Sequence, residues 1–179
     1  MIPKFALVAK KRAGKDTVCE LIRQLVTVPV HRIAFADPLK DEVAAALNVD
    51  RAYIEEHKAK VRPMLQWWGT EWRRETFSDT YWVDQTAKRV DDVTDGIVVV
   101  TDCRFPNETA MLAERGGIIV KITRNLPEDE HSRHVSERYV DELQFPNFKL
   151  DNNGTIADLK AQVALMLRQV CPNAVAATR

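Results

Sequence analysis

Long apolar runs, paired cysteines and an excess of either charge are all missing from this sequence. No apolar stretch approaches the roughly 18 residues that a membrane-spanning helix needs. The three cysteines are odd in number, lie far apart and form no Cys-x-x-Cys pair, which argues against a disulfide framework and a zinc knuckle. The first apolar strand also begins too early to follow a signal peptide. These absences predict a cytoplasmic protein with no membrane contact.

Charge balance and histidine spacing exclude two further classes of function. The 26 Lys and Arg residues are matched by 26 Asp and Glu residues, so the chain lacks the global basic field that direct binding of nucleic acid usually needs. His131 and His134 have no third metal ligand beside them, and we interpret them as surface residues. Any recognition of phosphate must therefore be local.

Short apolar or β-branched runs alternate with amphipathic stretches along the chain. This alternation predicts an α/β fold with a mainly parallel sheet, helices on both faces and ligands at the carboxyl ends of the strands. The expected strands cover residues 5–9, 31–35, 97–102, 118–122 and 148–150. The expected helices begin at Lys15, after Asp37 as N-cap, at Pro106 and after Thr155 as N-cap.

The length of 179 residues suits one domain. Residues 51–94 have a helical pattern rich in Trp and Arg, which indicates an insertion between core segments 1–50 and 95–171. Tryptophans at helical spacing are more often core residues, so we expect at least two of Trp67, Trp68, Trp72 and Trp82 to be packing residues. The tail, residues 172–179, is expected to be disordered.

The segment from Ala9 to Thr17 stands between a predicted strand and a predicted helix, where a phosphate-binding P-loop is found. Gly14 allows a tight turn, backbone amides point at the anion, and Lys15 adds a positive charge. Ala9 replaces the usual first glycine, and Asp16 separates the lysine from the hydroxyl of Thr17. The expected ATP-binding residues are Lys11, Arg12, Ala13, Gly14, Lys15, Asp16 and Thr17. A solvated basic turn is the alternative.

Asp102 ends the most β-branched run of the sequence, where a carboxylate that holds a magnesium-bound water is found in P-loop enzymes. The expected Mg²⁺ ligands are Thr17, Asp16 and Asp102, partly through water. A helix-capping role for Asp102 is the alternative. Arg104 and Glu108 are interpreted as an ion pair at the start of the next helix.

Six segments together resemble the bacteriophage deoxynucleoside monophosphate kinases, distant relatives of the adenylate and thymidylate kinases. They are 11–17 (KRAGKDT), 35–40 (FADPLK), 65–73 (LQWWGTEWR), 101–108 (TDCRFPNE), 134–137 (HVSE) and 151–155 (DNNGT). The resemblance spans roughly residues 5–170, and Ala9 is its departure because the family usually carries glycine there. It implies a P-loop kinase fold, ATP and Mg²⁺, and transfer of the γ-phosphate to a dNMP for phage DNA synthesis.

The resemblance also implies a lid at about residues 124–138, in which Arg124 and Arg133 close over the transferred phosphoryl group beside the catalytic Lys15 and Asp102. The alternative interpretation is that both arginines only make the surface more soluble. Aromatic side chains can stack on a base, and arginines can bind its phosphate through two hydrogen bonds. The expected acceptor-binding residues are Phe35, Asp37, Lys40, Arg62, Gln66, Trp68, Trp72 and Arg73, with Arg74 also on this segment.

Two other functions stay open from the sequence. One is a P-loop kinase of another small phosphorylated acceptor, such as phosphomevalonate or dephospho-coenzyme A. The other is a module that binds ATP without transferring phosphate, which the alanine at position 9 favours. The expected partners are small-molecule substrates, and a homodimer is left open.

Overall fold

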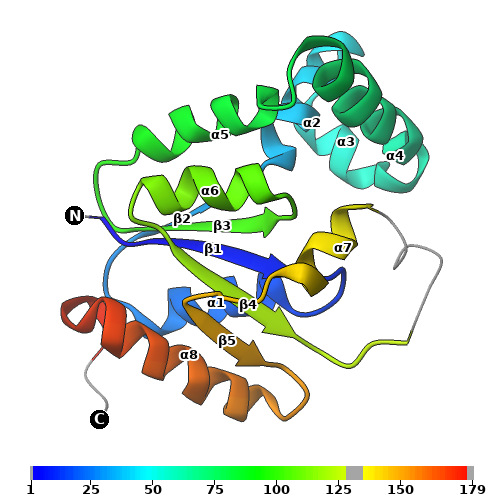
Figure 1. The fold of residues 1–179 in the computed structure, drawn as a ribbon. Helices are drawn as coiled ribbons and strands as arrows, with labels where there is room; N and C mark the ends of the chain where they lie inside the picture. Colours follow the sequence, from blue (N-terminus) through cyan, green and yellow to red (C-terminus); the bar gives the residue numbers. More distant parts are fainter. Residues whose placement is uncertain (1, 128–134, 177–179) are drawn as a thin grey trace.

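The computed structural model describes residues 2–127 and 135–176 and contains one parallel sheet in that part of the chain. Its strands are β1 (Lys4–Ala9), β2 (Val30–Ile33), β3 (Ile97–Cys103), β4 (Ile118–Thr123) and β5 (Phe148–Asp151). They lie in the order β2-β3-β1-β4-β5, with every neighbouring pair parallel (Figure 1). The predicted α/β fold is confirmed.

Helices connect the strands and extend beyond them. They are α1 (Lys15–Leu25), α2 (Ala36–Ala46), α3 (Arg51–Glu56), α4 (Lys58–Trp67), α5 (Tyr81–Asp91), α6 (Pro106–Glu114), α7 (Val135–Glu142) and α8 (Ile156–Val170). A ten-residue π-helix, η1 (Trp68–Phe77), continues α4, and a 3₁₀ turn, η3 (Pro172–Ala174), follows α8. No helix in the described part of the chain has the length and apolar character that a membrane crossing requires.

Successive side chains of β1 point to opposite faces of the sheet, and they belong to two separate layers of the core. Phe5 and Leu7 are fully buried and pack in a cluster with side chains of α1 and α8. Ala6 and Val8 are equally buried and belong to a second cluster, with side chains of α5 and α6. Figure 1 shows these two pairs of helices on opposite faces of the sheet. A parallel sheet covered on both faces requires apolar side chains in both directions, and these strands supply them.

Two predictions about element ends are wrong. Asp37 is not the N-cap of α2, because this helix already begins at Ala36. The tail is ordered as far as residue 176: the carbonyl of Ala174 accepts a 2.8 Å hydrogen bond from the N–H of Thr27, and the N–H of Ala176 donates to the carbonyl of Leu25 at 2.9 Å. These contacts attach the chain end to the loop after α1.

The other helix starts follow the sequence signals. Thr155 caps α8 as predicted, since its hydroxyl accepts from the Asp158 N–H at 3.2 Å and its own N–H donates to the Asp158 carboxylate at 2.9 Å. The predicted strands differ from the observed ones by no more than two residues at either end. Helix α7 begins in the stretch of residues 125–138, where the sequence pattern predicts a polar loop with one helical turn, and it extends beyond that stretch to Glu142.

The segment of residues 51–91 carries α3, α4, η1 and α5, of which α3 and α4 lie beyond the carboxyl ends of the strands (Figure 1). With α2 they form a third, smaller core around Val43, Ala44 and Ile54. Trp68 packs against this core and Trp82 is 3% exposed, so two of the four tryptophans are packing residues, as predicted. This segment therefore covers the edge of the sheet where ligands of parallel sheets bind.

Candidate active site

The loop between β1 and α1 has a backbone shape suited to close approach of an anion. Arg12 and Gly14 have positive φ values of 66° and 103°. A non-glycine residue in that region costs about 1–2 kcal/mol, and strain of this kind is concentrated at functional sites. Ala9 lies in the extended strand β1, where a Cβ is tolerated without strain.

Asn152 fixes this loop from the turn after β5. Its side-chain amide donates a 2.9 Å hydrogen bond to the carbonyl of Ala13, and its backbone N–H donates to the carbonyl of Thr123 at 2.8 Å. A Cβ on Gly14 would lie 2.3 Å from Asn152 Nδ2, so both this contact and the positive φ require glycine. The sequence analysis predicted no contact between Asn152 and the loop.

Helix α1 offers backbone N–H groups and a cation at the end of the loop. Among the described residues no side chain caps its amino terminus, so its first N–H groups are available to an anion. Lys15 Nζ lies 3.0 Å from Asp16 Oδ2. These donors fit the β- and γ-phosphates of ATP, which the predicted Lys11–Thr17 set would hold.

Oxygen atoms suited to Mg²⁺ lie beside these donors, on Asp16 and Thr17. Mg²⁺ usually keeps several waters and takes only one or two protein ligands besides the substrate phosphates. Among the described residues, no three His, Cys, Asp or Glu side chains lie close enough together to hold a metal ion. A site with only one or two protein ligands does not need such a cluster. The assignment of Thr17, Asp16 and Asp102 stays a prediction.

Asp102 connects β3 to the start of α2. Its Oδ1 accepts from the N–H of Phe35 at 2.7 Å, and its Oδ2 accepts from the N–H of Ala36 at 3.0 Å. Burial raises the pKa of Asp102, and these two hydrogen bonds oppose the rise. The carboxylate thus caps α2 from another element, which explains why that helix begins earlier than predicted.

The phosphate loop opens into a cleft of about 480 Å³, which we call the main cleft. Its lining contains eight cationic side chains, Lys11, Lys15, Arg32, Lys40, Lys58, Arg62, Arg74 and Arg104. Three acidic side chains, Asp16, Asp102 and Glu108, also line it. Since the whole chain has equal numbers of acidic and basic residues, positive charge is concentrated here.

One face of the continuous α4–η1 helix forms a wall of the main cleft. Along it lie Lys58, Arg62, Leu65, Gln66, Gly69, Thr70 and Arg74. The face therefore begins with two cations, continues with an apolar and amide-bearing middle, and ends in a further cation. Gly69 lets η1 approach α2 closely, because a Cβ there would lie 2.9 Å from Leu39 Cδ2.

Lys58 and Arg62 stand out because neither has an ion-pair or hydrogen-bond partner for its side chain among the described residues. Burial lowers the pKa of Lys58, and the charges of Lys40, Lys15 and Arg62 lower it further against the opposing effect of Glu55. Lys40 itself is buried and bonded to Glu55 at 2.6 Å. Four cations from three elements thus approach one another beside the phosphate loop.

The structure brings only part of the predicted acceptor set together. Phe35, Lys40, Arg62 and Gln66 line the main cleft, whereas Asp37, Trp68, Trp72 and Arg73 do not. Asp37 Oδ1 accepts from Arg51 at 2.9 Å, and its Oδ2 accepts from the N–H of Ala34 at 3.0 Å. Trp72 stacks on Trp67 with ring centroids 5.9 Å apart, on a partly exposed surface.

Trp68 and Arg73 are both bonded to Glu42 of α2. Glu42 accepts from Trp68 Nε1 at 2.6 Å, from Arg73 Nε at 2.9 Å and Nη2 at 2.8 Å, and from the Tyr81 hydroxyl at 2.5 Å. The Arg73 guanidinium also lies over the rings of Phe77 and Tyr81. This cluster attaches η1 and α5 to α2, and it places Arg73 in a packing role outside the main cleft.

The predicted lid arginines are only partly described. Arg124 follows β4, and its guanidinium donates a 3.4 Å hydrogen bond to the carbonyl of Arg12 in the phosphate loop. That contact places Arg124 next to the loop, although it is not part of the cleft lining. Arg133 lies outside the described residues. The lid itself stays a prediction.

Arg74 and Glu108 both line the main cleft. The sequence analysis placed Arg74 on the acceptor segment, but it did not predict Glu108 as a site residue. Arg74 donates to Glu108 Oε1 at 2.6 Å, and its guanidinium lies 4.4 Å from the ring centroid of Phe105. The expected pairing of Glu108 with the Arg104 side chain is replaced by a bond from the Arg104 backbone N–H, 2.7 Å from Oε2. A pair 34 residues apart has no local signal in the sequence.

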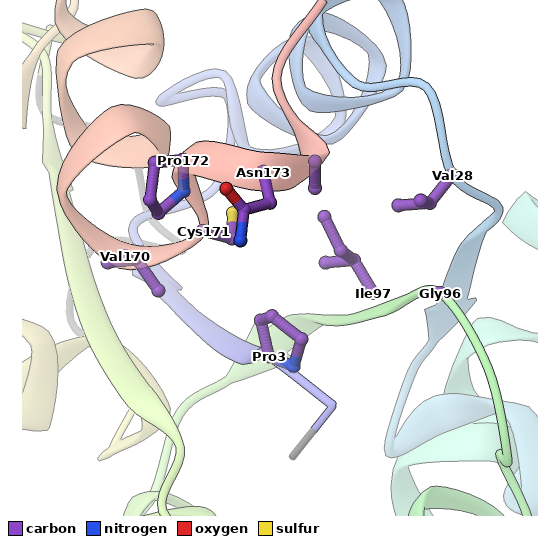
Figure 2. A pocket seen from close by; sticks show the side chains of 9 residues that line it. Pro3, Val28, Gly96, Ile97, Val170, Cys171, Pro172 and Asn173 are labelled. Carbon is purple, nitrogen blue, oxygen red and sulfur yellow. The ribbon is translucent and has the colours of Figure 1, made fainter.

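A second hollow, of about 380 Å³, lies beside the amino ends of the strands, away from the main cleft (Figure 2). Figure 2 shows it between the starts of β1 and β3, marked by Pro3 and Ile97, and the chain end around Asn173. None of its lining residues is charged. The main cleft, with the phosphate loop and the carboxyl ends of the strands, is therefore the candidate active site.

The fold and this site define a class, the P-loop kinases of small molecules. A family model described as phosphomevalonate kinase matches residues 7–117, and the chain belongs to this family. Among solved structures, shikimate kinase from Aquifex aeolicus superimposes with a TM-score of 0.51 over 92% of this chain and 96% of that chain, at 11% identity. That likeness concerns the fold. No curated protein matches the chain.

Proposed function

We propose that the chain is a deoxynucleoside monophosphate kinase, which transfers the γ-phosphate of ATP to a dNMP and produces a dNDP. The observation that carries the proposal is the pair Lys58 and Arg62, whose side chains form no ion pair or hydrogen bond among the described residues and face the main cleft near Lys15. Such a cluster favours an acceptor that already carries a phosphate.

The remainder of the cleft supports a nucleoside attached to that phosphate. Phe35 and Phe105 contribute aromatic rings to the lining, and Gln66 and Thr70 contribute polar groups that can both donate and accept hydrogen bonds. Aromatic surfaces stack on bases, while amide and hydroxyl groups bind base edges or sugar. The resemblance of six sequence segments to phage deoxynucleoside monophosphate kinases points to the same acceptor.

The proposed reaction is an in-line transfer without a covalent enzyme intermediate. ATP supplies the phosphoryl group, and its Mg²⁺ neutralises charge on the phosphates when bound. Lys15 and the N–H groups of the loop would hold the phosphates, and Lys58 and Arg62 would orient the acceptor. Arg124 and Arg133 of the lid would neutralise the charge that develops on the transferred phosphoryl group while the lid excludes water. An acceptor phosphate oxygen is already anionic at neutral pH, so the site needs no strong general base.

Phosphomevalonate is the second candidate acceptor, because the family model carries that description. It would use the same cationic end of the cleft, since it is also a phosphomonoester. It has no ring to stack against Phe35 or Phe105, and this difference favours the nucleotide.

An ADP-release assay with ATP and Mg²⁺ distinguishes these functions. The acceptors are dAMP, dGMP, dCMP, dTMP, their ribose forms and phosphomevalonate. Turnover of one or more deoxynucleotides supports the proposal, and turnover of phosphomevalonate alone replaces it by the second candidate. No ADP release with any acceptor supports the remaining alternative, a module that binds ATP without transfer.

A further inference from the structure

Arg74 and Glu108 form an ion pair at the end of the main cleft that is remote from Lys58. Their side chains are 15% and 2% exposed, and they join η1 to the start of α6. Both line the cleft, whereas the neighbouring Arg73 does not. A buried charge that also faces a ligand cleft is costly to place unless its partners hold it there.

Glu108 uses both carboxylate oxygens. Oε1 accepts from Arg74 Nη2 at 2.6 Å, and Oε2 accepts from the backbone N–H groups of Arg104 and Phe105 at 2.7 and 3.2 Å. The Phe105 ring lies against the guanidinium on one face. Among the residues that the structure describes, Arg74 Nη1 has only a long contact, 3.4 Å, to the carbonyl of Asp79. The guanidinium is therefore fixed in position while part of its donor capacity is left for a ligand in the cleft.

We propose that Arg74 binds the nucleoside part of the acceptor and that Glu108 is the positioning residue that holds Arg74 there. This inference rests on the proposed function, because it assigns the far end of the same cleft. Lys58 and Arg62 would bind the phosphate at one end of the α4–η1 face, and Arg74 would donate hydrogen bonds to oxygen or nitrogen acceptors at the other.

Glu108→Gln tests the positioning role because glutamine keeps the shape and has a single acceptor oxygen. That oxygen can serve either Arg74 or the N–H groups of Arg104 and Phe105, and the amide NH₂ then faces the other donors. We expect the KM for the dNMP to rise about tenfold, in line with the loss of one charged hydrogen bond. The KM for ATP should stay within about twofold of wild type, since the phosphate loop is not touched.

Acceptor binding should also depend on pH through Glu108. Burial raises the pKa of Glu108 to about 7, with Asp102 adding to the rise, while the Arg104 N–H and Arg74 oppose it. The titratable and charged groups around it are Arg74 on η1, Asp102 and Cys103 on β3, and Arg104. Below that pH the carboxylate takes up a proton and loses an acceptor site, so Arg74 is held less firmly and the KM for the dNMP rises.

The dNMP phosphate titrates near pH 6 in every variant, so the comparison between proteins isolates Glu108. The ratio of dNMP KM at pH 6 to that at pH 8 should be larger in wild type than in Glu108→Gln. Glu114→Gln, at the exposed end of α6, is the matched control and should behave as wild type. Equal ratios in wild type and Glu108→Gln would overturn the positioning role.

Arg74→Lys keeps a positive charge opposite Glu108. It provides a second test of the proposal if the Glu108→Gln protein does not fold. It should raise the KM for the dNMP about tenfold with little change for ATP, because lysine lacks the planar fork. If Glu108 acts through Arg74, the double variant Glu108→Gln/Arg74→Lys should be no worse than the weaker-binding single variant.

Unchanged dNMP KM in Arg74→Lys, or an equal rise for both substrates, overturns the inference while leaving the kinase assignment intact. A wild-type protein that turns over no deoxynucleotide overturns the proposed function, and the inference falls with it.

Discussion

Lys58 occupies a position that helix energetics disfavour. It is the first residue of α4, where a positive charge opposes the helix dipole, and it stands four residues before another cation, Arg62. Each effect costs a few tenths of a kcal/mol. A residue that violates local rules without a structural partner is typical of a functional site. Binding of an acceptor phosphate explains why two cations are kept there.

Lys58→Ala should therefore separate stability from function. We expect the melting temperature to stay equal or rise slightly, because a repulsive contact is removed, while the KM for the acceptor rises about tenfold. Lys60→Ala is the control, since Lys60 is exposed on the same helix and does not line the main cleft. A parallel loss of acceptor affinity in both variants would show that the effect is only general electrostatics.

Asn152 gives a second prediction for a single residue. Asn152→Ala removes the 2.9 Å bond to the Ala13 carbonyl and should loosen the phosphate loop, which raises the KM for ATP about fivefold to tenfold. Asn153→Ala is the comparison, because that side chain contacts Asn125 and Asp151. The KM for ATP measured at saturating acceptor decides the point, and equal values for the two variants would argue against the role of Asn152.

These residues show which parts of the site the sequence could reveal. Gly14 and Lys15 belong to a contiguous motif whose chemistry depends on local spacing, so they could be predicted. Asn152 contacts the loop from 139 positions away, and Glu108 meets Arg74 across 34. Such contacts depend on the tertiary fold, and no periodicity or spacing in one sequence encodes them.

The π-helix η1 explains why the acceptor wall was predicted only in part. Its wider turn, with bonds such as Ser78 N–H to the Arg73 carbonyl, changes which side chains share a face. Trp67, Trp72 and Phe77 then follow one another at five-residue intervals on an exposed side. Arg74 lines the main cleft, whereas the predicted Trp72 and Arg73 do not.

Glu42 of α2 is hydrogen-bonded to side chains of both η1 and α5. Partial burial would raise the pKa of Glu42, but hydrogen bonds from Arg73, Tyr81 and Trp68 outweigh it and hold the pKa below its usual value. A lowered folded-state pKa means that this stabilisation is present above the unfolded-state pKa and is lost as pH falls through the folded-state value.

Glu42→Gln should accordingly lower the free energy of unfolding by about 2 kcal/mol at pH 7, because a neutral amide cannot replace the carboxylate for four donors. For a chain of this size that is a fall of about 4–8 °C in melting temperature. The difference in the free energy of unfolding between wild type and Glu42→Gln should become smaller as pH falls below 4.5, the usual pKa of glutamate. Glu75→Gln, exposed on η1, is the control. A difference in the free energy of unfolding that does not change with pH would show that the charge of Glu42 is not the source of the stabilisation.

At the scale of the whole molecule, the sheet and its two covering layers could be predicted because the central strands β1 and β3 are apolar on both faces. The strand order and the position of the 51–91 segment come from tertiary packing, and the sequence pattern does not contain them. The family match agrees with a P-loop kinase of small molecules, and the shikimate kinase likeness agrees with the fold. The acceptor depends on the cleft itself.

The most direct measurement is transfer of label from γ-labelled ATP to a dNMP by wild type and by Lys15→Ala, with the dNDP product separated and counted. We expect labelled dNDP from wild type and at least about a hundredfold less from a folded Lys15→Ala protein, because the charge on the transferred phosphoryl group is no longer stabilised. Labelled dNDP at similar rates from both proteins, or none from wild type with any deoxynucleotide, would contradict the account.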